Sequence, residues 1–212
     1  CYCIRKNKYR YNYGRQANKT LKDIYVPEEL PSEWQSLKIK DLNLLKREPL
    51  VVGHLDLQNQ NWKSFSLNDL FDITGSKTTP ISELEEFGIG KYPFVTTQAT
   101  NNGVEGFYNY FTEKGNVLVV DSAVLGYCSY QPLDFSASDH VEKLIPKFSM
   151  DKYIGLFLST IINKEQYRYN YGRKASQSRL EQRSIKLPAI GEHPDWDFMR
   201  NYIKSLPYSS NI

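Results

Sequence analysis

One seven-residue segment, YRYNYGR, occurs twice in this chain, at 9–15 and again at 167–173. It interleaves tyrosine rings with arginines, so that groups able to neutralise phosphates stand beside rings able to stack on bases. In each copy a glycine precedes the last arginine, which can then extend from a tight loop. These residue types in this pattern are typical of nucleic-acid contact.

The positive charge of the chain is concentrated around the two copies. Residues 1–22 contain seven lysines and arginines and no acid, which gives that window a charge of +7. Residues 164–186 carry +5, and because the whole chain is only +3, the remaining residues carry −9 together. The small total is weakly informative, whereas its distribution favours an anionic partner.

The cations and hydroxyls of the repeat are therefore the first candidate contacts. They are Arg10, Arg15, Arg173, Lys174, Ser176 and Arg179. We expect the segment from Ser176 to Arg179 to be a polar loop suited to phosphate oxygens. Tyr167 and Tyr171 are four residues apart, which at a helix end favours packing of both rings against the core.

Two polar loops are candidates for contacts with base edges. The first follows a predicted strand and supplies Thr97, Gln98, Asn101 and Asn102. The second, at 75–80, supplies Lys77 and Thr78. Asn and Gln amides match two atoms of adenine in the major groove. Because a glycine follows Asn102, and Asn-Gly is the common pair of a hairpin turn, a purely structural role stays open for it.

Catalytic motifs do not stand out. The segment 88–90 is an isolated Gly-x-Gly without the third glycine of a phosphate loop, and no Asn/Asp-Pro-Pro-aromatic stretch of an amino-methyltransferase occurs. The three cysteines and three histidines are scattered and have no metal-ligand spacing. We expect no active site, no cofactor and no metal.

Size and composition are those of a globular protein. The 212 residues, 40% of them apolar, suffice for one sizeable core or for one domain plus part of another. An odd cysteine count without a signal peptide, and the lack of an apolar run of about 18 residues, lead us to expect a soluble cytoplasmic protein. The chain begins with Cys rather than Met, as expected for part of a longer polypeptide.

The repeat extends beyond the heptad over about 30 residues, through matching Ala, Leu, Pro and Trp positions. The interval of 158 residues is too long for a stacked repeat array, so each copy is expected to close a domain. We therefore predict that residues 1–50 are the closing segment of a preceding domain plus a linker. Residues 51–212 are predicted to form a complete domain.

The predicted elements are mostly short strands. Ser66 is expected to cap a helical turn that is followed by a strand ending at Gly75. Further strands are expected at 92–96, 105–110, 116–121, 124–130, 140–145 and 183–187. Apolar residues at helical spacing predict helices at 150–163 and 195–206, which places the helices near the C-terminus. Many strands with few helices indicate the α+β class.

Five pieces occur in a fixed order. They are Trp62 through the loop at 75–80, YPFVTT at 92–97 followed by NNGV at 101–104, GNVLVV at 115–120 with Gly126, FSASDHV at 135–141, and IKLP at 185–188. This order, together with the duplicated tail, resembles the target recognition domain of type I restriction-modification specificity subunits and of the related type IIB and IIG chains. The resemblance covers most of residues 55–212. It implies a mixed, twisted, mostly antiparallel β-sheet domain.

The resemblance also implies a function and partners. Such chains look like two recognition domains in tandem, each contacting half of a split site in double-stranded DNA, which would explain the duplicated segment. It implies that catalysis belongs to partners, namely DNA adenine methyltransferase subunits and a restriction subunit, or to fused domains. Type I chains usually follow each domain with a long helix, whereas the tail after Trp196 is short here, which favours the type IIB or IIG branch.

Two other classes remain as alternatives. A carbohydrate- or peptide-binding module also uses tyrosine-rich sheets with Asn and Gln loops, but it would bind an uncharged ligand without salt dependence, and the basic repeats count against it. A nuclease or methyltransferase would show turnover with a divalent metal or a methyl donor. We expect none.

Overall fold

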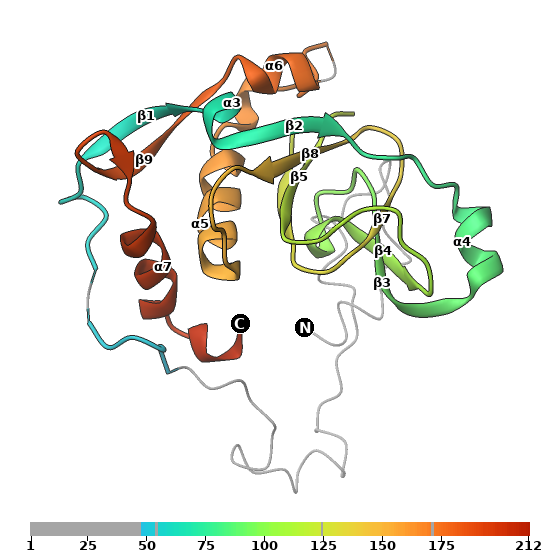
Figure 1. Ribbon diagram of the computed structural model, residues 1–212, viewed down its shortest axis with the longest axis horizontal. Coiled ribbons are helices and arrows are strands. Elements are labelled where there is room, and N and C mark those ends of the chain that lie inside the picture. Colours follow the sequence, from blue (N-terminus) through green and yellow to red (C-terminus); the bar gives the residue numbers. More distant parts are fainter. Residues whose placement is uncertain (1–47, 54, 124, 171) are drawn as a thin grey trace, which may run out of the picture. The chain divides into compact units, whose positions relative to one another are not determined.

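The computed structural model describes residues 48–53, 55–123, 125–170 and 172–212 (Figure 1). These residues belong to one compact unit, Lys46–Ile212. The first copy of the heptad, with Arg10 and Arg15, lies outside the described residues. None of the helices in the described part of the chain has the length and apolar composition needed to cross a membrane.

The domain begins with two strands separated by one helical turn. β1 (Trp62–Ser66) leads into α3 (Leu67–Leu70), and β2 (Phe71–Gly75) follows at once. The Ser66 side chain accepts a hydrogen bond from the Asn68 N–H, as the helix-capping pattern predicts. α3 therefore connects strands of two different sheets.

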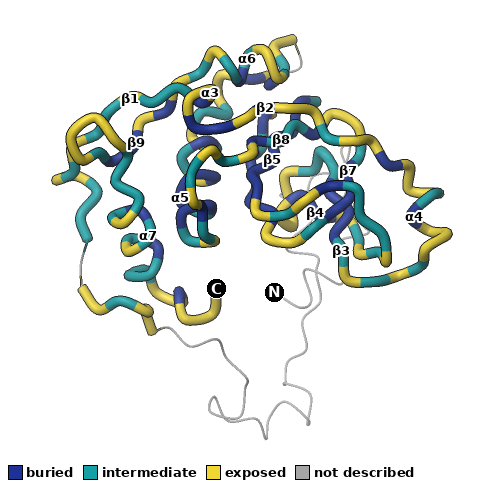
Figure 2. Tube along the Cα trace, in the orientation of Figure 1, coloured by how far each residue is buried: buried dark blue, intermediate teal, exposed yellow. Residues whose placement is uncertain are grey.

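A four-stranded antiparallel sheet forms the centre, in the order β2-β8-β5-β6. β8 spans Val141–Pro146, β5 spans Val117–Asp121 and β6 spans Cys128–Gln131. All five residues of β5 are buried, because both faces of the sheet are covered (Figure 2). Leu118 and Val120 belong to the larger core on one face, and Val117 and Val119 to a smaller core on the other.

A three-stranded sheet, in the order β4-β3-β7, supplies the smaller core. β3 (Ile89–Val95) pairs antiparallel with β4 (Val104–Tyr108) and parallel with β7 (Ser136–Ala137). The connection from β3 to β4 ends in a short 3₁₀ turn, η5 (Asn101–Gly103). A helix, α4 (Ile81–Phe87), precedes β3.

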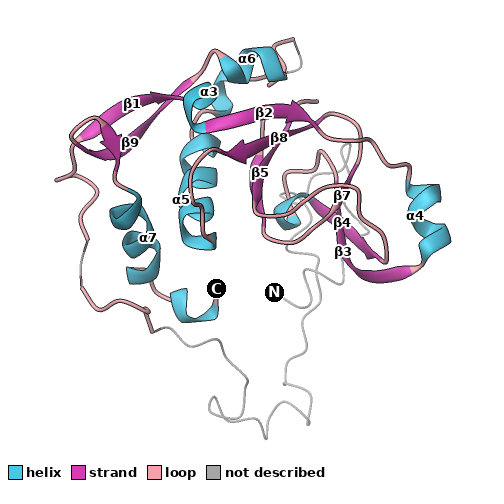
Figure 3. Ribbon diagram, viewed as in Figure 1, coloured by secondary structure: helices cyan, strands magenta, loops and turns pink. Residues whose placement is uncertain are grey.

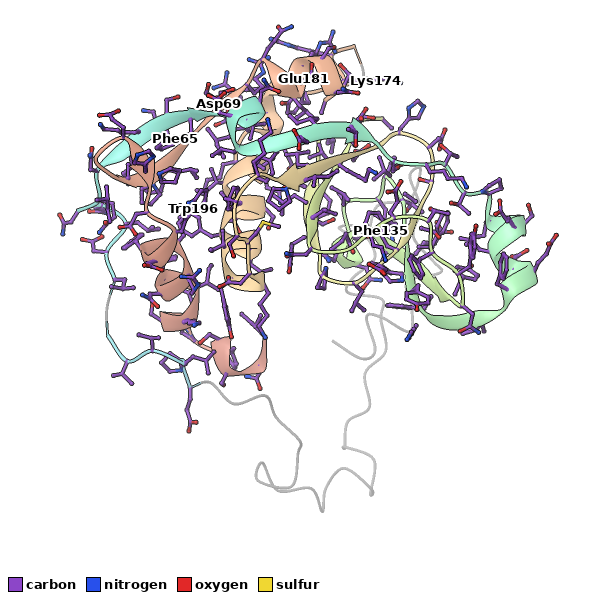
Figure 4. The ribbon with its side chains drawn as sticks, in the orientation of Figure 1. Phe65, Asp69, Phe135, Lys174, Glu181 and Trp196 are labelled. Carbon is purple, nitrogen blue, oxygen red and sulfur yellow. The ribbon has the colours of Figure 1, made fainter. Side chains whose placement is uncertain are left out.

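The C-terminal third supplies the larger core. α5 (Lys152–Asn163) lies against the four-stranded sheet, and α7 (Trp196–Ser205) packs beside α5 (Figure 3). The ring of Trp196 stacks on Phe148 at 3.9 Å between centroids (Figure 4). The other elements here are η6 (Gln166–Arg168), α6 (Gln177–Glu181), β9 (Ser184–Ile190), β10 (His193–Pro194) and η7 (Ser209–Asn211).

The predicted α+β class with a mixed, mostly antiparallel arrangement is confirmed, and the two long helices lie near the C-terminus as expected. Two short helices were missed. α4 forms at 81–87, where no helix was predicted, and α6 forms after Ser176, where a polar loop was predicted. β1 was also missed, and it pairs with β9 to form a third small sheet.

Candidate nucleic-acid interface

The second heptad forms a tight turn that presents its arginine. The N–H and C=O of Asn170 bond to the C=O and N–H of Arg173, at 3.2 and 2.9 Å. The Asn170 side chain also accepts the Gly172 N–H at 3.0 Å, an arrangement typical of Asn-initiated turns. Arg173 is exposed at the end of this turn. Local backbone chemistry therefore fixes the direction in which the cation extends.

Tyr169 anchors the turn to the domain. Its side chain is 6% exposed, and it lies so close to Gly126 that a Cβ there would be 2.6 Å from the Tyr169 ring. Burial raises the pKa of the Tyr169 hydroxyl, against the opposing effect of the Arg183 guanidinium. Gly126 has φ +67, a conformation that glycine adopts without strain. A glycine is thus needed at 126 both for its backbone and for the close approach.

The prediction for Tyr167 was wrong. Its ring is 74% exposed rather than packed on the core, because the 3₁₀ turn η6 directs the next tyrosine, Tyr169, inward instead. The Arg168 guanidinium lies over the Tyr167 ring at 4.9 Å and pairs with Glu165. An exposed ring beside a cation is a candidate contact that the helical-spacing argument discarded. Tyr171 lies outside the described residues.

α6 follows the heptad and carries Arg179, while Lys174 lies just before the helix. Leu180 is 1% exposed and fixes the helix to the core, and Ser176 precedes the first helical residue. The Arg179 Nη1 donates to the Lys174 carbonyl at 2.9 Å. Arg179 therefore supports the backbone of Lys174, whose side chain lies at the end of this segment (Figure 4).

The loop between β3 and β4 uses its amides to organise itself. Gln98 Nε2 and Asn101 Nδ2 both donate to the Val104 carbonyl, at 2.6 and 2.7 Å. Asn102 Nδ2 donates to the Tyr130 carbonyl at 2.9 Å, and Asn102 has φ 55. These bonds support the structural role that the sequence left open for Asn102. They also engage the NH₂ groups that would donate to a base.

The outer edge of β6 contacts both this loop and the end of α5, after which the basic segment (residues 164–186) begins. On the outer edge of β6, Asn163 accepts from the Cys128 N–H at 2.7 Å and donates to its carbonyl at 2.8 Å. Asn102 bonds to Tyr130 on that strand, two residues further on, a step of about 7 Å. Because Asn163 ends α5 and the heptad follows, the amide loop and the basic segment begin from neighbouring points.

The loop after β2 exposes Lys77 and Thr78 beside the ends of β3 and β7. Thr78 forms an isolated parallel bridge with Ala137, and the Thr79 N–H donates to the Ala137 carbonyl at 2.8 Å. The outer side of this region is a shallow hollow of about 350 Å³. Its lining is Thr78, Thr79, Pro80, Ile81, Phe94, Thr96, Glu105, Ser138 and Asp139. Thr97, half-buried, comes next after Thr96.

The structure separates this hollow from the two asparagines. Asn101 and Asn102 line another hollow of about 250 Å³, beside Phe107 and Leu133, which shares no lining residue with the first. Pro93 lines the asparagine hollow and Phe94 lines the other. Successive side chains of a strand point to opposite faces of a sheet, so the two hollows lie on opposite faces of β3. The predicted base-contact set is therefore divided between the two faces of this sheet.

The turn between β5 and β6 connects the Lys77 loop with the basic segment. The Ser76 N–H donates to the Val141 carbonyl, and the Ser122 N–H donates to the carbonyl of the adjacent His140, at 2.9 and 2.8 Å. Further along the same turn is Gly126, which meets Tyr169. A continuous set of contacts thus runs from Lys77 to the Asn170–Arg173 turn.

Residues 59–208 match the protein family described as the type I restriction modification DNA specificity domain. The chain belongs to this family. The resemblance stated from the five ordered pieces is thereby confirmed, and the matched part of the specificity domain contains every described candidate residue named above.

A curated relative of the specificity domain is the Type II restriction enzyme BgcI specificity subunit S.BcgI of Heyndrickxia coagulans. It is 29% identical over 152 residues, which cover 68% of this chain and 43% of the relative. The chain therefore spans less than half of that relative's length.

Two S subunits are among the solved structures that match part of the chain. The type I restriction-modification S subunit from M. genitalium matches with a TM-score of 0.47 at 18% identity, over 66% of this chain and 37% of that one. The HsdS subunit from Thermoanaerobacter tengcongensis matches with a TM-score of 0.47 at 15% identity, over 70% and 38%.

Proposed function

We propose that residues 51–212 form a complete target recognition domain that binds a specific sequence in double-stranded DNA. The observation that carries this proposal is the exposed cationic turn at Arg173, which is connected through the turn between β5 and β6 to the polar loop at Lys77, within a DNA specificity domain. Cations that meet phosphates fix a protein on a duplex, and neighbouring polar loops can then contact base edges.

The basic residues and the polar loops would contact different parts of the DNA. Arg173 and Lys174 suit the phosphate backbone, since Arg173 is an exposed cation at the end of a hydrogen-bonded turn and Lys174 is the next residue. The hollow beside Lys77 suits base edges better, because Glu105 and Asp139 in its lining would repel a phosphate and can accept from a base amino group. Thr97, which follows Thr96 of that lining, would extend this contact, whereas the Gln98 amide shares the Val104 carbonyl with Asn101.

We further propose that residues 1–50 close a preceding recognition domain, so that each domain contacts half of a bipartite site. Two observations support this arrangement: the repeated heptad, and the fact that the chain covers only 43% of its curated relative. The chain would then be part of a specificity subunit.

The partners would be DNA adenine methyltransferase subunits and a restriction subunit, which the specificity subunit would direct to the site. We assign no catalytic step to this chain itself. The support is the family membership and the name of the relative, a specificity subunit of a restriction enzyme.

The decisive experiment is selection from a pool of random-sequence duplexes, using the full-length protein that contains this chain together with its partners. We expect enrichment of a two-part motif. Binding of the selected duplex should weaken with salt, with a log-log slope of about −0.9 per phosphate contact. Absence of any enriched motif, or an affinity independent of salt, would contradict the proposal and favour an uncharged ligand.

A further inference from the structure

Glu113 is a buried acid in the segment between β4 and β5, close to the loop after β2. Its side chain is 9% exposed. Its backbone is fixed, because the N–H donates to the Phe135 carbonyl at 2.9 Å and the carbonyl accepts the Phe135 N–H at 3.0 Å. Phe135 is itself fully buried in the smaller core (Figure 4). The carboxylate is thus attached to a rigid part of the domain.

The two carboxylate oxygens of Glu113 have different partners. Oε1 accepts the backbone N–H of Lys77 at 2.6 Å, across 36 positions of sequence. Oε2 accepts from the Lys143 Nζ at 2.5 Å, and the Lys143 side chain is only 15% exposed. Removing one member of a buried ion pair is costly because the other charge is left without its partner. The contact with Lys143 therefore helps to hold the Glu113 side chain in place beside the Lys77 backbone.

These contacts hold the loop from two sides. On the other side of Lys77, Thr79 is held by the Ala137 carbonyl at 2.8 Å and by the Thr112 hydroxyl at 3.2 Å. The Lys77 side chain itself remains exposed. An exposed side chain selects between bases only if its backbone is held to within about 0.5 Å. The hydrogen bond from the Lys77 N–H to the Glu113 carboxylate fixes the backbone at Lys77 itself.

We propose that Glu113 is a positioning residue for base selection, acting through the backbone of Lys77; this rests on the proposed function. It touches no DNA and contributes nothing to phosphate binding. Its loss should therefore reduce the discrimination between bases at the positions next to the Lys77 loop. Affinity for unrelated duplexes should remain.

The test uses the full-length protein with its partners, and the duplex recovered by selection with the wild type. Glu113→Ala is combined with Lys143→Met, so that no unpaired charge stays buried. Binding is measured by fluorescence anisotropy for every single-base change of the duplex. We expect discrimination at one or two adjacent positions to fall at least fivefold and other positions to change less than twofold. Glu113→Gln with Lys143→Met, which keeps one acceptor oxygen for the Lys77 N–H, should give a smaller loss at the same positions.

The matched control is Lys114→Met with Asp134→Ala, which removes a neighbouring ion pair and a loop contact to Gly115 without touching Lys77. Equal losses at all positions in both double variants would show a general structural role and overturn the inference. Unchanged discrimination in the folded Glu113 variant would also overturn it. Should that variant not fold, Glu113→Gln with Lys143→Met decides, with at least a twofold local loss expected and no loss contradicting the inference.

A cycle with Lys77→Ala completes the test. Because Glu113 acts through Lys77, its variant should add less than a twofold further loss once Lys77 is Ala, and fully additive losses would contradict the inference. If the wild type itself selects no sequence from the pool, the proposed function fails. If it selects a sequence and the Glu113 variants leave discrimination intact, only this inference fails.

Discussion

At the scale of single residues, the cations in and after the second heptad differ in the contacts that hold them. Arg173 extends from a turn closed by two backbone bonds, and Lys174 has its carbonyl held by Arg179. Arg168, by contrast, is paired with Glu165. A cation without an acid beside it gains most from a phosphate, which makes Arg173 and Lys174 the better candidates for backbone contact.

We therefore predict that Arg173→Ala with Lys174→Ala weakens binding to all duplexes alike, by roughly tenfold or more, since hydrogen bonds to charged groups are worth about 1.5 to 3 kcal/mol. The salt slope should become shallower by about 2, one per lost contact. Anisotropy titrations at several salt concentrations measure both. Lys152→Ala with Lys204→Ala, which removes two cations beside Tyr153, should leave binding within about twofold. A loss confined to one sequence would count against phosphate contact.

Substitutions of Gln98 and Asn102 are expected to change different properties, namely base discrimination and folding stability. Gln98→Ala should relax discrimination at one base position, which single-base substitution of the selected duplex would reveal. The opposite result, unchanged discrimination, would mean that the bond from Gln98 to the Val104 carbonyl is its whole role.

Asn102→Ala should instead lower stability. It removes the bond to the buried Tyr130 carbonyl, at a cost of about 1 to 3 kcal/mol, and places Ala at positive φ. Asn102→Gly loses the same bond without the backbone strain, so it should be the less damaging of the two. Urea unfolding of both variants measures the difference. Equal stability of wild type and Asn102→Ala would rule out the structural role.

At the scale of elements, the contact between α5 and the central sheet depends on one small residue. A Cβ at Gly155 would lie 2.6 Å from the ring of Tyr130, whose hydroxyl is held by Asn116. The helix therefore approaches the sheet more closely than any other residue at 155 would allow.

This closeness reverses the usual effect of Gly→Ala in a helix. The substitution normally stabilises by about 1 kcal/mol, but overpacking a filled core costs about 1 to 3 kcal/mol. We predict that Gly155→Ala is destabilising, as measured by urea unfolding. Thr160→Ala on the exposed side of α5 is the control, with a change within about 0.5 kcal/mol. A more stable Gly155→Ala protein would show that the Tyr130 ring moves aside freely.

Element prediction from the sequence succeeded where alternation or helical spacing was complete. β5 and α5 contain several apolar residues at the spacing expected for a strand and a helix, and both were predicted within a few positions of their observed ends. α4 was missed because its seven residues bury only Leu84, although Glu83 in the first turn and Gly88 at the end were usable signals. α6 buries only Leu180, which gives no period at all.

The candidate site was less predictable for a different reason. Residue types suggested Gln98, Asn101 and Asn102 as base contacts, but all three amides donate to backbone carbonyls. The Asn102 partner, Tyr130, is 28 positions away, which no local pattern contains. Glu113 was equally hidden, since its partners Lys77 and Lys143 are 36 and 30 positions distant. Composition thus indicated the polar loops, while tertiary contacts decide which of their side chains are free.

At the scale of the whole domain, Asp151 joins the two long helices. It caps α5 through the N–H groups of Tyr153 and Ile154 and pairs with Arg200 of α7. Burial alone would raise the pKa of Asp151, but the Arg200 bond and the two N–H bonds outweigh it and leave the pKa below its usual range. The ionised form is therefore favoured by folding.

The sign of the pH effect follows. A carboxyl whose pKa is lower in the folded than in the unfolded protein makes its full contribution to folding stability above the unfolded pKa, about 3.9. This contribution is lost as the pH falls through the folded pKa. We predict that Asp151→Asn is less stable than wild type at pH 7 and that the difference shrinks below about pH 4. Urea unfolding across pH 2 to 7 measures it, with the exposed Asp69→Asn as control. A difference independent of pH would contradict this account.

The amides on the outer edge of β6 also constrain how such a protein can change. An edge strand with free carbonyl and N–H groups is a template on which other chains add and aggregate. Asn163 bonds to both backbone groups of Cys128 and Asn102 bonds to the Tyr130 carbonyl, so a further strand could pair there only by displacing these amides. Because Asn102 belongs to a loop that would vary between target sequences, retargeting by loop exchange should keep an amide at this position or accept a protein prone to self-association.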